Sequence, residues 1–376
     1  MNFLIAALCL VTLTASARVI SVGPGERIKS IAEAASLAKD DDVVEIASGE
    51  YRGDVAVWTQ DRLTLRAVGG RVKLIAAGVA AEGKGIWVVR SAAMTVEGFE
   101  FSGATVPDHN AAGIRFEKGS LVVRNCAFLD NENGILTSNN PESVLTIENS
   151  EFGWNGYGDG QTHNLYVGAI ASLSVTGSYF HHARVGHLLK SRAAVNHIFY
   201  NRLTDEAGGH ASYELEFPNG GVAYVVGNII QQGSQTQNPH LISYAAEGYK
   251  WPRNALYLVN NTLVDNRPSG GIFLRVKPGD VKVMAVNNVL VGKGSLESAA
   301  PGEYKNNFTV DWNEFDLAAR EDYRLKRSSK LIGKAIDAGS ADGQALMPTS
   351  EYVHPRSTVT LQGVARNPGA LQSIKR

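Results

Sequence analysis

The sequence predicts an all-β fold, a right-handed parallel β-helix of roughly ten coils, capped at its amino-terminal end by an α-helix. One observation is a pattern of alternating apolar residues, an Asn or Gly, and then an aromatic or aliphatic residue, which recurs eight times. The recurring Asn or Gly positions are 24 to 33 residues apart, and they are Gly98, Asn125, Asn149, Gly177, Asn201, Asn228, Asn261 and Asn288. Repeats of this length, with short strands, are typical of solenoids in which each coil stacks on the previous one.

The composition agrees with a folded chain of this kind. The 376 residues are 44% hydrophobic and 19% charged, which is enough to bury a sizeable core. Glycine is frequent (39) and proline is not (12), which indicates tight turns rather than disorder. The net charge of −1 gives no overall attraction to nucleic acid or to an anionic membrane. We therefore expect no nucleic-acid partner, and a charged polymer would have to bind a local patch.

Residues 1–17 have the features of a secretory signal peptide. Residues 3–13 are apolar but too few to span a bilayer, and Ala15-Ser16-Ala17 offers a small-residue cleavage site. We expect a secreted or periplasmic mature chain, a monomer of residues 18–376 forming one domain without a membrane span. Its one cysteine, Cys126, excludes an internal disulfide and is expected to be buried.

The two ends of the mature chain depart from the repeat. Residues 27–39 form a helical pattern, because Ile28, Ile31 and Ala35 recur at three- and four-residue steps. A helix there would cover the apolar core and the strand edges at the open end of the coil. Residues 300–376 lose the repeat and are expected to form a closing carboxyl-terminal segment.

Several of these motifs together resemble the pectate-lyase-like superfamily of right-handed parallel β-helices. They are the repeated pattern, the helix ending at Asp40-Asp41-Asp42, the following Gly49-Glu50-Tyr51 and the carboxyl-terminal run 322–339. The resemblance extends over nearly the whole mature chain and implies the fold. Superfamily members include lyases, hydrolases, epimerases and phage adhesins, so the fold alone does not identify an activity.

Four strand-like blocks between Gly158 and Gly248 form the candidate site. Alternate residues of a strand face outward, and neighbouring coils lie roughly 4.8 Å apart. Counting back from the turns puts Tyr166, Lys190 and Glu216 in one outward column. The full outward set is Asn164, Tyr166, Leu188, Lys190, Arg192, Glu214, Glu216, Ser243 and Glu247. The further residues expected to bind substrate are His163, His187, Tyr213, Trp154 and Trp251. The alternative is a solvated ladder of charges without a function.

The chemistry that these residues favour is β-elimination of a uronate-containing polysaccharide. It needs a base, a cation beside the substrate carboxylate, and an acid for the leaving oxygen. Lys190 can be the base if a neighbouring Arg favours its neutral form, and Arg192 can bind the carboxylate in a bidentate way. Tyr166 or His163 can then donate the proton. If Glu216 contacts Lys190 instead of Arg192, the lysine stays charged and its role becomes binding the substrate carboxylate.

The segment from His187 to Arg192 also resembles the catalytic-base segment of the alginate lyase and chondroitinase B family. In that family an equivalent Lys-Ser pair provides the base, which implies the same role for Lys190. The calcium-binding carboxylates of the family are replaced here by Ala183 and Val185, and its arginine on the next coil by the region 214–216. We therefore expect no calcium, no other metal and no cofactor.

Two other functions stay open. Glu214 and Glu216 would lie roughly 6.5–7 Å apart on one face, near the lower limit for an inverting glycoside hydrolase, with Glu247 as a further partner. Alternatively, the chain is a non-catalytic glycan-binding protein. The aromatic residues that would then stack on sugars are Trp154, Tyr157, Tyr166 and Trp251.

Overall fold

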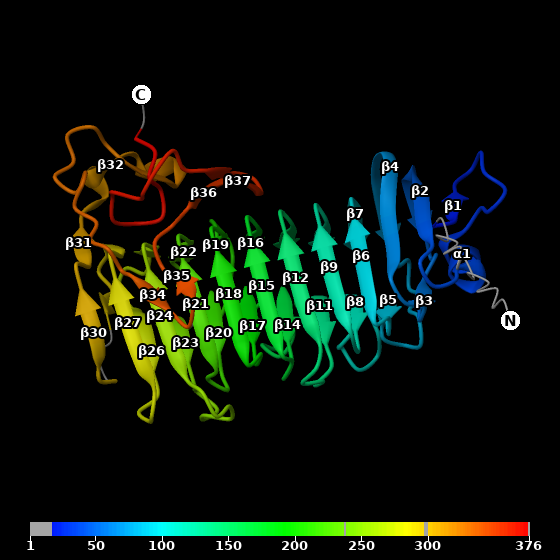
Figure 1. Cartoon of the computed structure of the whole chain (residues 1–376), viewed down its shortest axis with the longest axis horizontal. Helices are drawn as coiled ribbons and strands as arrows, with labels where there is room; N and C mark the ends of the chain where they lie inside the picture. Colours follow the sequence, from blue (N-terminus) through cyan, green and yellow to red (C-terminus); the bar gives the residue numbers. More distant parts are fainter. Residues whose placement is uncertain (1–16, 237, 297–299, 375–376) are drawn as a thin grey trace, which may run out of the picture.

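A computed structural model describes residues 17–236, 238–296 and 300–374, which form a parallel β-solenoid of about ten turns (Figure 1). The predicted signal peptide lies outside the described residues apart from Ala17. The all-β fold and the repeat are confirmed. Among the described residues, no helix combines the length and the apolar character needed to cross a membrane.

Two sheets form the walls of the coil. One has ten strands, which in chain order are β3 Ala56–Trp58, β5 Gly85–Val89, β8 Ala112–Phe116, β11 Asn133–Thr137, β14 Leu165–Val167, β17 Leu189–Ser191, β20 Leu215–Phe217, β23 His240–Tyr244, β26 Ile272–Val276 and β29 Ser295–Leu296. The other has 21 strands and turns a corner within each coil. Its strands are β1 Val19–Val22, β2 Val43–Arg52, β4 Leu63–Ile75, β6 Ala93–Glu97, β7 Phe99–Ser102, β9 Ser120–Arg124, β10 Ala127–Leu129, β12 Val144–Glu148, β13 Glu151–Gly153, β15 Ser172–Thr176, β16 Tyr179–His181, β18 Val195–Phe199, β19 Arg202–Thr204, β21 Val222–Val226, β22 Ile229–Gln232, β24 Ala255–Val259, β25 Thr262–Asp265, β27 Lys282–Val286, β28 Val289–Gly292, β30 Gly302–Lys305 and β31 Phe308–Val310.

The amino-terminal helix is shorter than predicted. α1 spans Ile31–Leu37 and lies at the amino-terminal end of the coil (Figure 1). It starts late because Ile28 pairs with Val22 in a β-bridge and Ser30 is the N-cap, its hydroxyl accepting from the Glu33 N–H. Ile31, Ala34 and Ala35 are buried, whereas the role of the helix as a cap stays a prediction.

Apolar side chains at matching positions of successive coils fill the interior. Phe101, Phe128, Phe152 and Phe180 stack in a column with ring centroids 4.7 to 4.9 Å apart. Cys126 is buried and free, as predicted. A column of stacked aromatic rings fixes the register of the strands, because a slip by one residue would turn the rings to the solvent.

An asparagine ladder lines one corner of the coil, but it does not include every asparagine of the repeated sequence pattern. Its described members are Asn201, Asn228, Asn261, Asn288 and Asn307. From the second member on, each side-chain oxygen accepts from the backbone N–H and from the side-chain amide of the preceding asparagine. Asn125 and Asn149 lie one residue earlier at the same corner, with φ of 47° and 49°. In their coils Cys126 and Ser150 occupy the ladder position. The repeat count could not separate these adjacent positions because Asn suits both.

Asn228→Ala should lower the free energy of unfolding by about 2–4 kcal/mol, because several buried polar groups lose a partner at once. The Asn228 amide donates to the Ile198 carbonyl and to Asn261, and its oxygen serves two donors of Asn201. Denaturant unfolding would measure the change. Asn149→Gly is the control, since glycine tolerates the positive φ there. Equal stabilities of the two variants would contradict a supporting role for the ladder.

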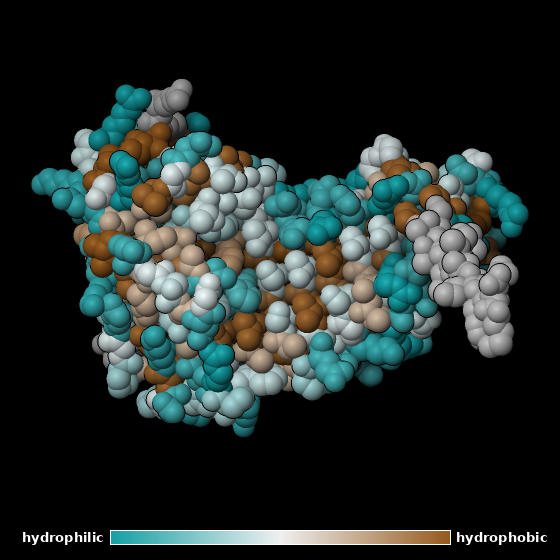
Figure 2. All heavy atoms as spheres, in the orientation of Figure 1, coloured by the Kyte–Doolittle hydropathy of each residue, from teal (hydrophilic) through white to brown (hydrophobic). Residues whose placement is uncertain are grey.

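The carboxyl-terminal segment leaves the coil after β31 and folds back over the large sheet (Figure 1). It contains the short helices η1 Trp312–Glu314 and η2 Ala318–Arg320 and three strand pairs, which are β32 Phe315–Leu317 with β33 Asp322–Leu325, β34 Ser340–Ala341 with β35 Gln344–Ala345, and β36 Ser350–Val353 with β37 Ser357–Thr360. Hydrophobic side chains occupy the middle of the face in Figure 2, with hydrophilic ones around them. The segment covers part of that apolar surface, where Ala338 and Leu346 pack with Tyr224 and Tyr257.

Candidate functional site

The predicted column on the outer face of the ten-stranded sheet is present. Tyr166 in β14 pairs with Lys190 in β17, and Lys190 pairs with Glu216 in β20. The three side chains therefore lie on successive coils, each about 4.8 Å from the next. They face outward because Leu165, Leu189 and Leu215, one residue earlier, point into the core.

Two cations flank the phenol of Tyr166. Arg192 Nη1 donates to Tyr166 Oη at 2.7 Å. Lys190 Nζ and Arg192 Cζ lie 5.6 and 5.1 Å from the centre of the Tyr166 ring. A donor on the oxygen and positive charge beside the ring both stabilise negative charge on Oη.

Two carboxylates hold these cations in place. Glu216 Oε2 lies 3.0 Å from His187 Nε2 and 3.4 Å from Lys190 Nζ. Glu247 Oε1 lies 2.6 Å from Arg192 Nη2 and 3.7 Å from Lys190 Nζ. Burial acts to raise the pKa of Glu216, but the hydrogen bond from His187 and the charges of His187 and Lys190 outweigh it and lower the pKa. Lys190 is therefore an ion-paired ammonium, the second of the two arrangements expected from the sequence.

A second outward column, of imidazole and phenol rings, runs beside the first. His163 stacks on His187 with ring centroids 4.4 Å apart, and Tyr213 meets His187 edge-on at 4.9 Å. The His187 backbone N–H donates to His163 Nδ1 at 2.9 Å, so the proton of a neutral His163 is on Nε2. Burial, helped by the charges of His187, Lys190 and Arg192, lowers the pKa of His163 well below its ordinary value. His163 is thus a neutral hydrogen-bond donor at neutral pH.

A cleft of about 400 Å³ opens over these residues. The loops that follow β7 and β13 form its walls, and the ten-stranded sheet forms its floor. The lining residues are Asp108, His109, Asn110, Asn133, Leu136, Asp159, Gly160, Gln161, Thr162, His163, Tyr166 and Lys190. Sequence reasoning missed the wall residues His109 and Asp108, because their loop lies outside the repeat and no periodic pattern marks it.

The outward positions predicted for Glu214, Asn164 and Leu188 are wrong. All three side chains are fully buried. They stand just before β20, β14 and β17 begin, where the chain bends and the alternation of the strand does not yet apply. The Asn164 side-chain oxygen accepts from the Asn155 amide, and the Asn164 amide donates to the His181 carbonyl, so Asn164 belongs to a second internal ladder. Neither Glu214 nor Asn164 can contact a polymer on the outer face.

The predicted tryptophans have different surroundings. Trp251 Nε1 donates to the Arg192 carbonyl at 3.0 Å, so this half-buried side chain supports the end of β17. Trp154 stacks on His182 at 4.6 Å and does not line the cleft. Tyr157 is 53% exposed and stacks on His109 at 3.5 Å. It lines a separate cavity, which shares His109 with the cleft.

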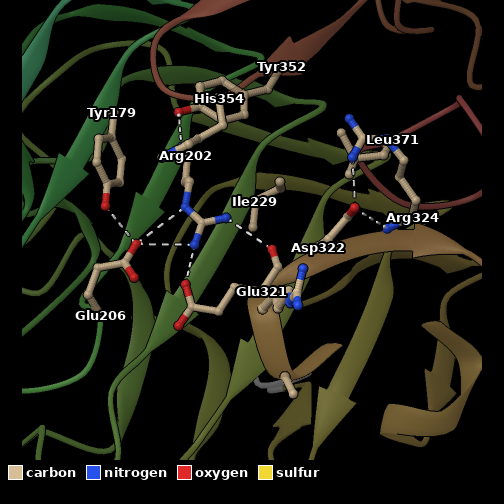
Figure 3. A pocket seen from close by; sticks show the side chains of 12 residues that line it. Tyr179, Arg202, Glu206, Ile229, Glu321, Asp322, Arg324, Tyr352, His354 and Leu371 are labelled. Atoms are coloured by element: carbon tan, nitrogen blue, oxygen red, sulfur yellow. Dashed lines mark hydrogen bonds and ion pairs between the residues drawn. The ribbon is translucent and has the colours of Figure 1, made fainter. Parts of the chain in front are cut away.

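Figure 3 shows a second cavity, of about 460 Å³, between the large sheet and the carboxyl-terminal segment. The buried Arg202 guanidinium bonds both Glu206 and Glu321, and Tyr179 Oη donates to Glu206 at 2.8 Å. Because these charged groups satisfy one another, we interpret the cavity as part of the junction that attaches the carboxyl-terminal segment to the coil.

Within the residues that the structure describes, no three His, Cys, Asp or Glu side chains are arranged to hold a metal ion. That the site works without a metal or cofactor stays a prediction.

Comparisons with known proteins identify the fold. No family model matches the chain, and no curated protein matches it in sequence. Among solved structures, the pectate lyase Pel9A superimposes with a TM-score of 0.61 at 13% identity, over 95% of this chain and 97% of that chain. A mutant pectin methylesterase in complex with a hexasaccharide reaches a TM-score of 0.36 at 10% identity, over 82% of this chain and 96% of that chain. The second similarity is too low to support an argument.

Proposed function

Because the chain has the right-handed type of parallel β-helix found in pectate-lyase-like proteins, we propose that it is an exported polysaccharide lyase. In this proposal it is secreted or periplasmic and cleaves a uronate-containing polymer by β-elimination. The observation that supports this most is the Tyr166 hydroxyl, which bonds Arg192 and lies beside Lys190 at the floor of an open cleft.

Lys190 and His163 bind the carboxylate of the uronate in this mechanism. The ammonium lies 3.4 Å from Glu216 Oε2 and 3.7 Å from Glu247 Oε1, and it has three N–H donors, so it can turn a donor toward the substrate. His163 offers its Nε2–H from the neighbouring column. Neutralising the carboxylate stabilises the negative charge that develops when the adjacent C–H bond breaks.

Tyr166 transfers the proton. As a phenolate, stabilised by the Arg192 hydrogen bond, it takes the proton from the carbon next to the carboxylate. The electron pair of that C–H bond forms a carbon–carbon double bond as the glycosidic oxygen leaves. The proton then passes from Tyr166 to the leaving oxygen, so that no water is consumed and the phenolate is restored.

The products distinguish this mechanism from hydrolysis. We would incubate the protein with polygalacturonate, alginate and glycosaminoglycans, and follow ultraviolet absorbance together with new reducing ends. A lyase produces one unsaturated, absorbing uronate for each new reducing end. New reducing ends without absorbance would exclude β-elimination.

A glycoside hydrolase is the second candidate, now with Glu216 and Glu247 as its carboxyl pair. Both carboxylates contact Lys190 Nζ, at 3.4 and 3.7 Å, so these two oxygens lie no more than about 7 Å apart. A separation of up to about 7 Å includes the distance between the two carboxyl groups of retaining glycosidases, and also the shortest such distances in inverting glycosidases. Glu214 has no part in this alternative because it is buried. A glycan-binding protein without activity would bind a polymer and release no new ends.

A further inference from the structure

Arg115 occupies the same outward column as the proposed catalytic residues. In the ten-stranded sheet, Arg115 of β8 pairs with Leu136 of β11. Leu136 pairs with Tyr166 on the next coil, and Tyr166 pairs with Lys190 on the one after. Arg115 is therefore three coils from Lys190, about 14 Å along the axis of the coil. Between the two cations lies the half-exposed Leu136, which also lines the cleft.

Arg115 forms no salt bridge within the described part of the chain, although the charge of Glu117 acts on it from a distance. The residue is half-buried, and its Nε is inaccessible and has no hydrogen-bond partner among the described residues. Glu117, the nearest acid on the same strand end, is bound by Lys84 at 2.7 Å and by Arg90. Burial lowers the pKa of the Arg115 guanidinium, but an arginine stays charged in a protein.

An unpaired, partly desolvated guanidinium is prepared to bind an anion. Its desolvation costs free energy that a bidentate carboxylate recovers on binding. The surrounding groups suit a sugar polymer. Leu136 offers an apolar surface to a pyranose ring, and the loop containing His109 and Asn110 supplies polar groups at its side.

We propose that Arg115 is a second carboxylate-binding position for the acidic polysaccharide, which lies along the ten-stranded sheet from Arg115 over Leu136 to Tyr166 and Lys190. This inference rests on the proposed function, because the polymer is taken to be the one cleaved at Tyr166. It requires a substrate with carboxylates repeated along its length. Only oligomers long enough to span three coils can engage both cations.

Binding of oligomers of graded length tests the position. The probes are oligogalacturonates and alginate oligomers of two to eight units, titrated calorimetrically into a Tyr166→Phe background that does not turn them over. Arg115→Gln should weaken the binding of the longest oligomers about tenfold or more and leave the shortest unchanged. Arg115→Lys should recover part of the loss. Lys118→Gln, which removes an exposed charge from the same coil, is the control and should not change the length dependence.

The outcomes separate this inference from the proposed function. If the native protein produces unsaturated products but Arg115→Gln binds every length as the Tyr166→Phe background does, the carboxylate position is refuted and the lyase stands. If binding depends on length through Arg115 but no unsaturated product forms, the lyase is refuted instead. Absence of binding to all probes would overturn the carboxylate position. Thermal unfolding verifies that each variant is folded, and Arg115→Lys provides the test if the glutamine variant is not.

Discussion

Tyr166→Phe should lower kcat by about 10²–10⁴-fold on whichever uronate polymer the native protein cleaves, with little change in KM. The reason is that the substitution removes the phenolic oxygen, which accepts from Arg192 Nη1 at 2.7 Å and which moves the proton in the proposed mechanism. Lys190 and His163, which bind the substrate carboxylate in the proposed mechanism, remain. The formation of unsaturated product, measured at saturating substrate, reports the change.

Lys190→Ala tests the other half of the mechanism. It should reduce kcat/KM at least as strongly and also raise KM, because the ammonium contacts the carboxylate in both the bound substrate and the transition state. Tyr257→Phe, which removes a hydroxyl from β24 in the other sheet, is the control and should keep native activity. Activity of Tyr166→Phe within a few-fold of the native protein would remove Tyr166 from the reaction. Lys190 would then have to be reconsidered as the base.

The fold was predictable because it repeats. Each coil must bury the same apolar positions, so the pattern around Asn201, Asn228 and Asn261 recurs and identifies a solenoid from one sequence. The register from Tyr166 to Glu216 followed from the same count. The ends of the strands at the corners of the coil could not be predicted from the repeat, because side chains alternate between inward and outward only inside a strand. Glu214 and Asn164 stand one residue outside a strand and turn inward.

The pairing of charges in the site could not be derived from spacing. Whether Glu216 contacts Lys190 or Arg192 depends on rotamers and on Glu247, which comes from the loop after β23, 57 residues beyond Lys190. The wall of the cleft at His109 comes from a loop with no periodic signal. Arg115 could not be singled out from the sequence, because a lone arginine in a strand looks ordinary until the structure shows that no described residue forms a salt bridge with it.

The interior also contains a buried acid, Asp205, that takes no part in the proposed reaction. Its titration should change the stability of the protein with pH. Asp205 lies at the end of β19, where burial raises its pKa to about 8, with the nearby Glu206 adding to the effect. Its Oδ2 accepts from the Ala211 N–H at 2.8 Å, and its Oδ1 has no partner among the described residues. Glu214 is fully buried and close enough to Asp205 and Asp265 for their charges to act on it, and burial raises the pKa of Glu214 well above its ordinary value. At neutral pH we expect both acids to be protonated.

The contribution of Asp205 to the stability of the native protein should therefore fall as the pH rises from about 4 to about 8. In this range the unfolded chain has released the Asp205 proton while the folded chain still binds it, so the free energy of unfolding falls by up to about 1.4 kcal/mol per pH unit. Asp205→Asn keeps the shape of the protonated acid and cannot ionise. We expect the variant to match the native protein at about pH 4 and to be the more stable of the two at pH 9. Denaturant unfolding of both proteins at each pH measures the difference between their free energies of unfolding. His163, His187 and the other groups that the two proteins share contribute equally to both and cancel in this difference. Parallel pH profiles of the two proteins would show that Asp205 is ionised in the folded state.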